Sequence, residues 1–370
     1  MGFDFRARRG LRALVVSTAL AASVALVAPV PAGAAPPTNV LRARRGAQWL
    51  AHQVRANGGY VKNFGNIDAV NTAYAVIAMR ATGVDRPASQ QAIVWLRHQI
   101  GTALQAGGHD APGALAAFVM ASVSGAQNPR QFGGTAKRNN LVNRLLATAR
   151  TSGRDKGLFG VQDPTFDGAF RQGLALAALE AAHVSPKDPR VAAGIAWLER
   201  QQCKSGLWQA YRKNTKVSCV RANPTTFTGP DTNSTGLAVQ GLAAWGRRPR
   251  RQTVLASLDA IQSADGGFPF VAAKNQASDP NSTALIVQAI VAEKSGPTAT
   301  RWKKGTATPY SALGAYQLEC TNPDFGAFWY PGSPTDANTF ATVQAVPALA
   351  GKTLPVARNT ATMTVPLTPC

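Results

Sequence analysis

Six aspartates stand near the start of apolar runs in this chain of 370 residues. Each is followed by small or hydroxyl residues and then by a strongly apolar stretch. They are Asp68, Asp110, Asp167, Asp231, Asp279 and Asp336. If the runs are parallel helices whose N-termini meet, these carboxylates would rim one mouth and bind a ligand there. Asp is also a preferred N-cap, because its carboxylate accepts first-turn N–H groups, and the two roles can coexist.

Three glutamines form a second candidate set, deeper in the same runs. Gln240, Gln288 and Gln344 each stand five residues after a threonine, namely Thr235, Thr283 and Thr339, and this spacing predicts that they lie at matching depth in their helices. A buried amide must be hydrogen-bonded. These side chains could therefore form a ladder between adjacent helices, or they could contact a ligand inside a cavity.

An internal repeat supplies the elements that position these residues. The signature Trp-Leu-x-x-Gln recurs at residues 49–53, 95–99 and 197–201. A segment that combines glycine with an aromatic residue follows most of these signatures. We expect it to be a turn, because glycine permits the positive φ that tight turns require. Each repeat thus predicts an amphipathic outer helix, a Gly-rich turn and a buried inner helix. Since a closed ring needs no polar end caps, we expect an all-α fold, a closed α/α toroid or (α/α)6 barrel of about six helix-pair repeats.

One turn carries a resemblance to known families. The sequence Gln262-x-x-Asp265-Gly266-Gly267-Phe268 resembles the repeat of prenyltransferases and squalene-type terpene cyclases. The helix starts that combine Asp with Thr are similar to the α/α toroid of the cobalamin carriers, intrinsic factor and transcobalamin. The resemblance covers about residues 43–350 and implies the toroid fold. It does not by itself imply an activity, because function lies in sites that vary within a fold.

The cyclases that the chain resembles protonate an alkene with an Asp-x-Asp-Asp motif. The matching segment, residues 229–235, holds one carboxylate, so Asp231 is the single catalytic candidate and no catalytic set is complete. Aromatic residues make up 7% of the chain and fall mostly in predicted turns or outer helices, so we expect few rings to line a cavity and hold carbocations. The zinc set of the prenyltransferases is missing, and we expect no metal. The carrier resemblance leaves a cobalamin-like ligand as an alternative, and no other cofactor is expected.

Residues 1–35 have the features of an export signal. An arginine-rich start precedes an Ala/Val-rich run and the small residues Ala32-Gly33-Ala34. We therefore expect a secreted or cell-envelope protein, with either the Sec or the Tat route open. The expected organisation is a signal peptide at 1–35, the toroid at 36–352 and a C-terminal tail at 353–370. An even cysteine count in an exported chain predicts two disulfides, Cys203–Cys219 and Cys320–Cys370, of which the second tethers the tail.

The formal charge of +21 narrows the class of partner. The densest basic segments, 247–251 and 301–304, are either a solvated surface or an attraction to anionic cell-envelope polymer. Nucleic acid is not expected, because the chain is exported and shows no nucleic-acid module. We expect a monomer.

Together these patterns predict a secreted toroid protein that binds a small molecule or peptide at a carboxylate-rimmed cavity, without catalysis. The alternative is a degenerate terpene cyclase or prenyltransferase-like enzyme. A cavity lined by several aromatic rings would favour the alternative, and a polar cavity would count against it.

Overall fold

The computed structural model describes residues 39–163 and 166–359, so the predicted export signal lies outside the described residues. The helical fold class is confirmed. Strands occur in the described residues as two small hairpins, β1 (Lys62–Asn63) with β2 (Asn66–Ile67) and β3 (Gln105–Ala106) with β4 (His109–Asp110). In the described ranges, no helix combines the length and the apolar character needed to cross a membrane.

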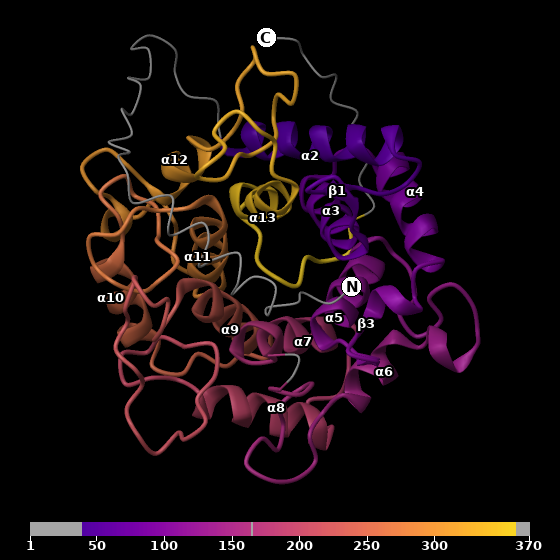
Figure 1. Cartoon of the computed structure of the whole chain (residues 1–370), viewed down its shortest axis with the longest axis horizontal. Coiled ribbons are helices and arrows are strands. Elements are labelled where there is room, and N and C mark those ends of the chain that lie inside the picture. Colours follow the sequence, from indigo (N-terminus) through magenta and orange to yellow (C-terminus); the bar gives the residue numbers. More distant parts are fainter. Residues whose placement is uncertain (1–38, 164–165, 360–370) are drawn as a thin grey trace.

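Six helices, which we call the inner helices, surround the centre of the molecule (Figure 1). They are α3 (Ala69–Thr82), α5 (Pro112–Ser124), α7 (Ala169–Ala181), α9 (Thr232–Ala244), α11 (Pro280–Ala292) and α13 (Thr339–Leu349). Each packs against the next along the chain, and α13 packs against α3, so the packing order returns to its start. Their sequences are apolar on nearly every side because almost every side of them is buried.

The remaining helices lie on the outside of this set (Figure 1). They are α2 (Asn39–Ala56), α4 (Arg86–Arg97), α6 (Leu141–Ala147), α8 (Pro189–Arg200), α10 (Arg251–Ile261) and α12 (Pro309–Gly314), with short 3-10 turns η1 (Thr102–Leu104), η2 (Lys137–Asn139) and η3 (Thr300–Trp302). Outer helices pack chiefly on the inner helix that precedes them, as α4 does on α3 and α8 on α7, while α2 packs on both α3 and α13. The chain thus alternates between the two sets, as the repeat predicts.

A recurring threonine fixes four of the Gly-rich turns onto the inner helices that follow them. The Oγ1 atom of this residue accepts a hydrogen bond from a backbone N–H in the turn. The pairs are Thr72 with Val61 N at 3.1 Å, Thr235 with Trp208 N at 3.0 Å, Thr283 with Phe268 N at 2.9 Å and Thr342 with Phe328 N at 2.9 Å. In α7, Gln172 Oε1 takes this place and accepts from Phe159 N at 2.9 Å. The hydroxyl residues near the inner-helix starts are therefore part of the repeat's architecture.

A recurring glutamine joins each of three turns to the next repeat. Its Nε2 donates to a glycine carbonyl in its own turn and to a backbone carbonyl of the following repeat. The acceptors are Gly206 and Pro249 for Gln202, Gly266 and Trp302 for Gln262, and Gly326 and Arg42 for Gln317. The last of these bonds, at 2.9 Å, connects the C-terminal repeat to α2 at the start of the described chain.

The closest approach among the inner helices is between α7 and α9. A Cβ atom on Gly173 would collide with the backbone carbonyl of Leu237, and one on Gly241 would collide with that of Gly173. Glycine is required at both positions because the two helix backbones are in direct contact.

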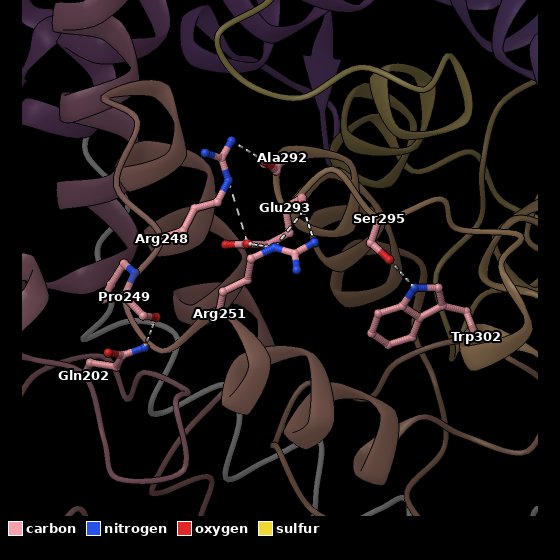
Figure 2. Close-up of polar contacts among 8 residues, drawn as sticks. All are labelled: Gln202, Arg248, Pro249, Arg251, Ala292, Glu293, Ser295 and Trp302. Atoms are coloured by element: carbon pink, nitrogen blue, oxygen red, sulfur yellow. Dashed lines mark hydrogen bonds and ion pairs between the residues drawn. The ribbon is translucent and has the colours of Figure 1, made fainter.

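Part of the basic segment 247–251 is used within the fold (Figure 2). Glu293, at the C-terminal end of α11, is buried, and its carboxylate lies 3.1 Å from Arg251 Nε and 3.8 Å from Arg248 Nε. Arg251 Nη2 also donates to the Glu293 carbonyl at 2.6 Å, and Arg248 Nη2 donates to that of Ala292 at 3.0 Å. Burial raises the pKa of Glu293, and the two guanidinium groups oppose that shift. These arginines therefore close the end of α11.

The segment after α13 runs across the space that the inner helices surround, at the end opposite their N-termini (Figure 1, yellow). Leu354 N donates to Gln240 Oε1 on α9 at 3.0 Å. Further on, Asn359 Nδ2 donates to the Arg80 carbonyl on α3 at 2.8 Å, and Asn359 N donates to the Ser124 carbonyl on α5 at 3.3 Å. The side chains of Leu354 and Val356 are buried. This segment, 352–359, which we call the crossing segment, thus covers the far end of the inner helices.

The predicted disulfide between Cys203 and Cys219 is confirmed, with its Cα atoms 5.7 Å apart. Cys370 lies outside the described residues, so the Cys320–Cys370 pairing stays a prediction.

Candidate functional site

A cavity of about 880 Å³ lies among the inner helices, from their N-terminal ends to about their ninth positions, and all six contribute side chains to its wall. Leu354 of the crossing segment forms part of its lining at the far end. The other end is bordered by the loops that precede α7, α9 and α11. The cavity is therefore a pocket with one covered end rather than an open channel.

The wall is built in layers that follow from the helix period. Counted from the N-cap residue, lining side chains recur at the second, sixth and ninth positions. The second-position layer contains Val70, Gly113, Phe170, Asn233 and Phe340; the sixth contains Tyr74, Leu174, Leu237, Leu285 and Gln344; the ninth contains Ile77, Gln288 and Pro347. Since each residue adds about 1.5 Å along a helix, these layers span about 10 Å of depth.

Aromatic rings are a main component of this wall, contrary to the expectation from the sequence. The lining rings are Tyr74, Phe166, Phe170, Tyr211, Phe227, Phe270 and Phe340. The expectation was wrong because four of these rings, at 166, 211, 227 and 270, belong to loops. A ring in a loop was assumed to pack on helix ends, whereas these loops turn inward over the mouth.

The mouth is bordered by the longest insertion in the repeat, residues 221–230. Within it, Asn223 N donates to the Thr228 carbonyl at 3.0 Å, and Thr228 N donates back at 3.3 Å. Phe227, at the tip, has φ +53°, is 46% exposed and lies 6.4 Å from the ring of Phe270. Val220, which follows the disulfide-bonded Cys219, also lines the cavity. The disulfide therefore holds the chain that forms one side of the mouth.

Three of the six aspartates cap inner helices. Asp68 accepts from Asn71 N at 2.8 Å, Asp231 from Ser234 N at 2.6 Å and Asp279 from Ser282 N at 2.8 Å. Asp279 is buried, and this burial raises its pKa to about 6, against the opposing effect of the bonds from Ser282. The expected capping role is present at these positions.

The other three aspartates do not begin a helix, so the expectation that each starts an inner helix is wrong for them. Asp110 lies in β4 and pairs with Arg144, whose Nη2 lies 2.6 Å from Oδ1. Asp167 is buried, accepts from Val161 N at 2.8 Å and pairs with Arg171 at 2.9 Å. Asp336 is exposed, and Asn338 caps α13 in its place.

The structure does not bring six carboxylates together at the cavity wall. Of the six aspartates, Asp231 alone lines the cavity. It is 8% exposed, and its Oδ1 serves as the cap acceptor of α9. Acid–base cleavage of glycosides uses two carboxylates that flank the bond, and the described wall offers one. Within the described ranges, no three His, Cys, Asp or Glu side chains are grouped so as to hold a metal ion.

The three glutamines have different environments. Gln240 does not line the cavity; its Oε1 accepts from Leu354 N and, at 3.3 Å, from Thr353 Oγ1. Gln288 and Gln344 do line it, and the Oε1 atom of each is buried without a hydrogen-bond partner. Gln288 Nε2 donates to the Gln344 carbonyl at 3.4 Å.

Gln344 does not occupy the depth expected for it. The spacing from Thr339 suggested a match with Gln240 and Gln288, but Thr342 is the threonine that binds the turn in α13. Pro347 therefore occupies the ninth position of this helix, and Gln344 occupies the sixth. The prediction of matched depth was wrong because α13 begins at an Asn cap that the search for aspartates did not detect.

Comparison with known proteins finds no matching family model and no matching curated protein. Solved structures do match. An unsaturated glucuronyl hydrolase from a Bacillus species has TM-score 0.58 and 15% identity, over 84% of this chain and 95% of that chain. The type II terpene cyclase MstE from Scytonema has TM-score 0.56 and 13% identity, over 84% and 97%. An α-1,6-mannanase from Salegentibacter has TM-score 0.53 and 12% identity, over 85% and 98%.

These neighbours include a hydrolase, a cyclase and a mannanase. At such low identities they show the shared helical fold alone, because different activities occur on one fold. The function must be argued from the wall of the cavity.

Proposed function

We propose that this protein is a secreted, closed toroid of six helix-pair repeats that binds an elongated, largely apolar small molecule in its central cavity, without converting it. The observation that carries this proposal is the aromatic and aliphatic lining of a cavity of about 880 Å³. Cavities of this size suit small organic ligands. Transfer of apolar ligand surface from water into such a wall is favourable in proportion to the area buried.

The shape of the cavity favours a small molecule over a peptide. The crossing segment covers the far end through the bond from Leu354 N to Gln240, so an extended peptide has no path through the molecule. A sugar would require many polar partners, which this wall provides in few places. The same argument disfavours a cobalamin-like ligand, whose amide side chains need hydrogen bonds.

A second candidate function is a cyclase-like reaction on an isoprenoid chain. The rings around the cavity favour it, since aromatic faces stabilise cationic intermediates, and Asp231 would then be the acid at the mouth. Against it stands the single carboxylate of the described wall, which is already the cap acceptor of α9. Binding without conversion therefore fits the site better.

Export and contact with the envelope form part of the proposal. The leader-like sequence at 1–35 and the disulfide at Cys203–Cys219 support export, because disulfides persist in oxidising compartments. The net charge of +21 supports attraction to anionic envelope polymer.

The test is to purify the protein from its own host and to identify by mass spectrometry what an organic solvent extracts from it. We expect a lipophilic compound at about one per chain. Leu237→Trp fills the middle layer and should reduce the extracted amount at least tenfold. Val94→Trp is the matched control, since Val94 is 47% exposed on α4 and does not line the cavity. Extraction of a peptide or an oligosaccharide, or equal amounts from both variants, would refute the proposal.

A further inference from the structure

The floor of the cavity contains a buried acceptor that the protein leaves unsatisfied. Gln288 is 2% exposed and lies in the ninth-position layer of α11. Its Oε1 has no hydrogen-bond partner. A buried polar atom without a partner is costly and uncommon in native structures.

The orientation of this amide is fixed by its other end. Gln288 Nε2 donates to the backbone carbonyl of Gln344 at 3.4 Å. A backbone carbonyl can only accept, so exchanging the nitrogen and oxygen of Gln288 would place two acceptors against each other. The oxygen of Gln288 is therefore the atom without a partner.

Gln240 shows that a glutamine at the ninth position of an inner helix can have its side-chain oxygen hydrogen-bonded. It occupies the same ninth position on α9, and its Oε1 accepts from Leu354 N at 3.0 Å and from Thr353 Oγ1 at 3.3 Å. The crossing segment thus supplies donors to one glutamine of the pair and not to the other. Because Gln288 lines the cavity, a molecule bound inside it is in position to supply the missing donor.

The surroundings determine what kind of donor fits. Gln344 Oε1, one layer closer to the mouth on the adjacent α13, is a second acceptor without a partner. Tyr74 lies in the same layer on α3, which packs against α13. Burial raises the pKa of Tyr74 despite the nearby Arg171, with a smaller upward effect from Asp68, so its hydroxyl stays neutral.

Neither an anionic nor a cationic end group suits this floor. Among the described residues that line the wall, Arg171 is the cationic side chain. It lies near the mouth and is paired with Asp167. The carboxylate of the wall, Asp231, stands at the N-cap of α9, about 13 Å from the floor by helix rise. A buried charge without a counter-charge is strongly disfavoured.

We propose that the ligand ends in an uncharged hydroxyl group that donates its single proton to Gln288 Oε1, with its apolar body extending past Leu285 and Leu237 toward the rings at the mouth. This inference rests on the proposed function and specifies the ligand as a lipophilic alcohol.

The test uses four probes that share one chain: farnesol, farnesyl methyl ether, farnesoic acid and farnesylamine. Their affinities for the full-length protein are measured by displacement of an apolar fluorescent dye. We expect farnesol to bind about tenfold tighter than the ether, which has no donor, and tighter still than the acid and the amine. Gln288→Leu should weaken farnesol about tenfold and leave the ether unchanged.

Two further variants separate the end group from the fold and from the apolar wall. Leu237→Ala removes wall surface and should weaken all four probes to the same degree. Gln288→Glu places a carboxylate at the floor and should reverse the order so that farnesylamine binds best. Circular dichroism confirms that each variant is folded. Equal binding of all four probes to the unmodified protein would overturn this inference and leave the apolar cavity standing. If none of the probes displaced the dye, both proposals would fail.

Discussion

The two ends of the central cavity are built in different ways. The far end is covered by the crossing segment, whose backbone is bonded to α9, α3 and α5. The mouth is formed by loops, with Phe227 46% exposed and one disulfide beside it. Covalent and hydrogen-bonded constraints thus fix the borders, while the wall between them is held by apolar packing. The difference teaches that changes to these fixed borders, the crossing segment and the disulfide-bonded loop, should affect stability, whereas changes to exposed rim side chains such as Phe227 should affect ligand exchange.

The largest effect is expected from the disulfide at the mouth. Cys203→Ser with Cys219→Ser should lower the free energy of unfolding by about 3 kcal/mol, because the bridge limits the unfolded chain across a loop of this length. Urea unfolding with and without reductant measures it. In reductant, the unmodified protein and the double variant should unfold at the same midpoint, because reductant opens the predicted Cys320–Cys370 pairing in both. An unchanged midpoint would show that the mouth does not depend on this bridge.

Asp279, the N-cap residue of α11, should make the free energy of unfolding depend on pH by a similar amount. The pKa of Asp279 is raised from 3.8 to about 6 by burial, so the folded state binds more protons than the unfolded state between these values. Stability from this group is therefore present at low pH and is lost as the pH rises through about 6. The loss amounts to at most about 3 kcal/mol.

Asp279→Asn should remove this dependence, because Asn is also a good N-cap, as Asn338 is in α13. Urea unfolding between pH 4 and pH 7 compares the variant with the unmodified protein. Asp336→Asn is the control, since Asp336 is exposed and does not cap a helix. A variant that kept the full pH profile of the unmodified protein would contradict the assignment.

Gln240 and Gln288 occupy the same helix position, but Gln240 binds the crossing segment and Gln288 lines the cavity, so their substitution compares the far end with the wall. Gln240→Leu leaves the Leu354 N–H without its acceptor and should cost about 1–3 kcal/mol of stability. Gln288→Leu removes an oxygen that has no partner and one long bond, from Nε2 to the Gln344 carbonyl at 3.4 Å, so the ligand-free protein should lose little or no stability. Thermal unfolding of both ligand-free variants checks the contrast. Equal losses of stability in the two variants would show that Gln288 Oε1 has a hydrogen-bond partner in the ligand-free protein.

The smallest effect on stability is expected at the rim. Phe227→Ala removes an exposed ring and should change the free energy of unfolding by less than about 0.5 kcal/mol. The dissociation of a bound apolar probe should become several-fold faster, because the ring lines the mouth of the cavity. Stopped-flow dilution measures that rate. A rate equal to that of the unmodified protein would show that Phe227 does not limit the exit of a ligand at the mouth.

The sequence predicted the helical architecture better than the site. Helix periodicity and the repeated turns are local patterns, so the alternation of outer and inner helices could be recognised, and so could the disulfide at Cys203–Cys219. The aspartates were partly misjudged because an acidic residue before an apolar run can also pair with a distant arginine, as Asp110 does with Arg144. No local pattern indicates such a partner.

The lining of the cavity depends on how loops fold back, and this is a tertiary property. Phe227 and Phe270 are 43 positions apart in the printed numbering, yet their rings meet at the mouth. Phe170 and Phe340 were more accessible to prediction, since each stands two residues after an N-cap. A search for Asn and Gly caps beside Asp caps would have identified that layer.

The most direct test of the central claim is to return the extracted ligand to ligand-free protein and to analyse it after prolonged incubation. The account predicts that the compound is bound at about one per chain and recovered chemically unchanged, by the unmodified protein and by Asp231→Asn alike. Conversion to a new product by the unmodified protein, lost in Asp231→Asn, would contradict it and would identify the cavity as an active site.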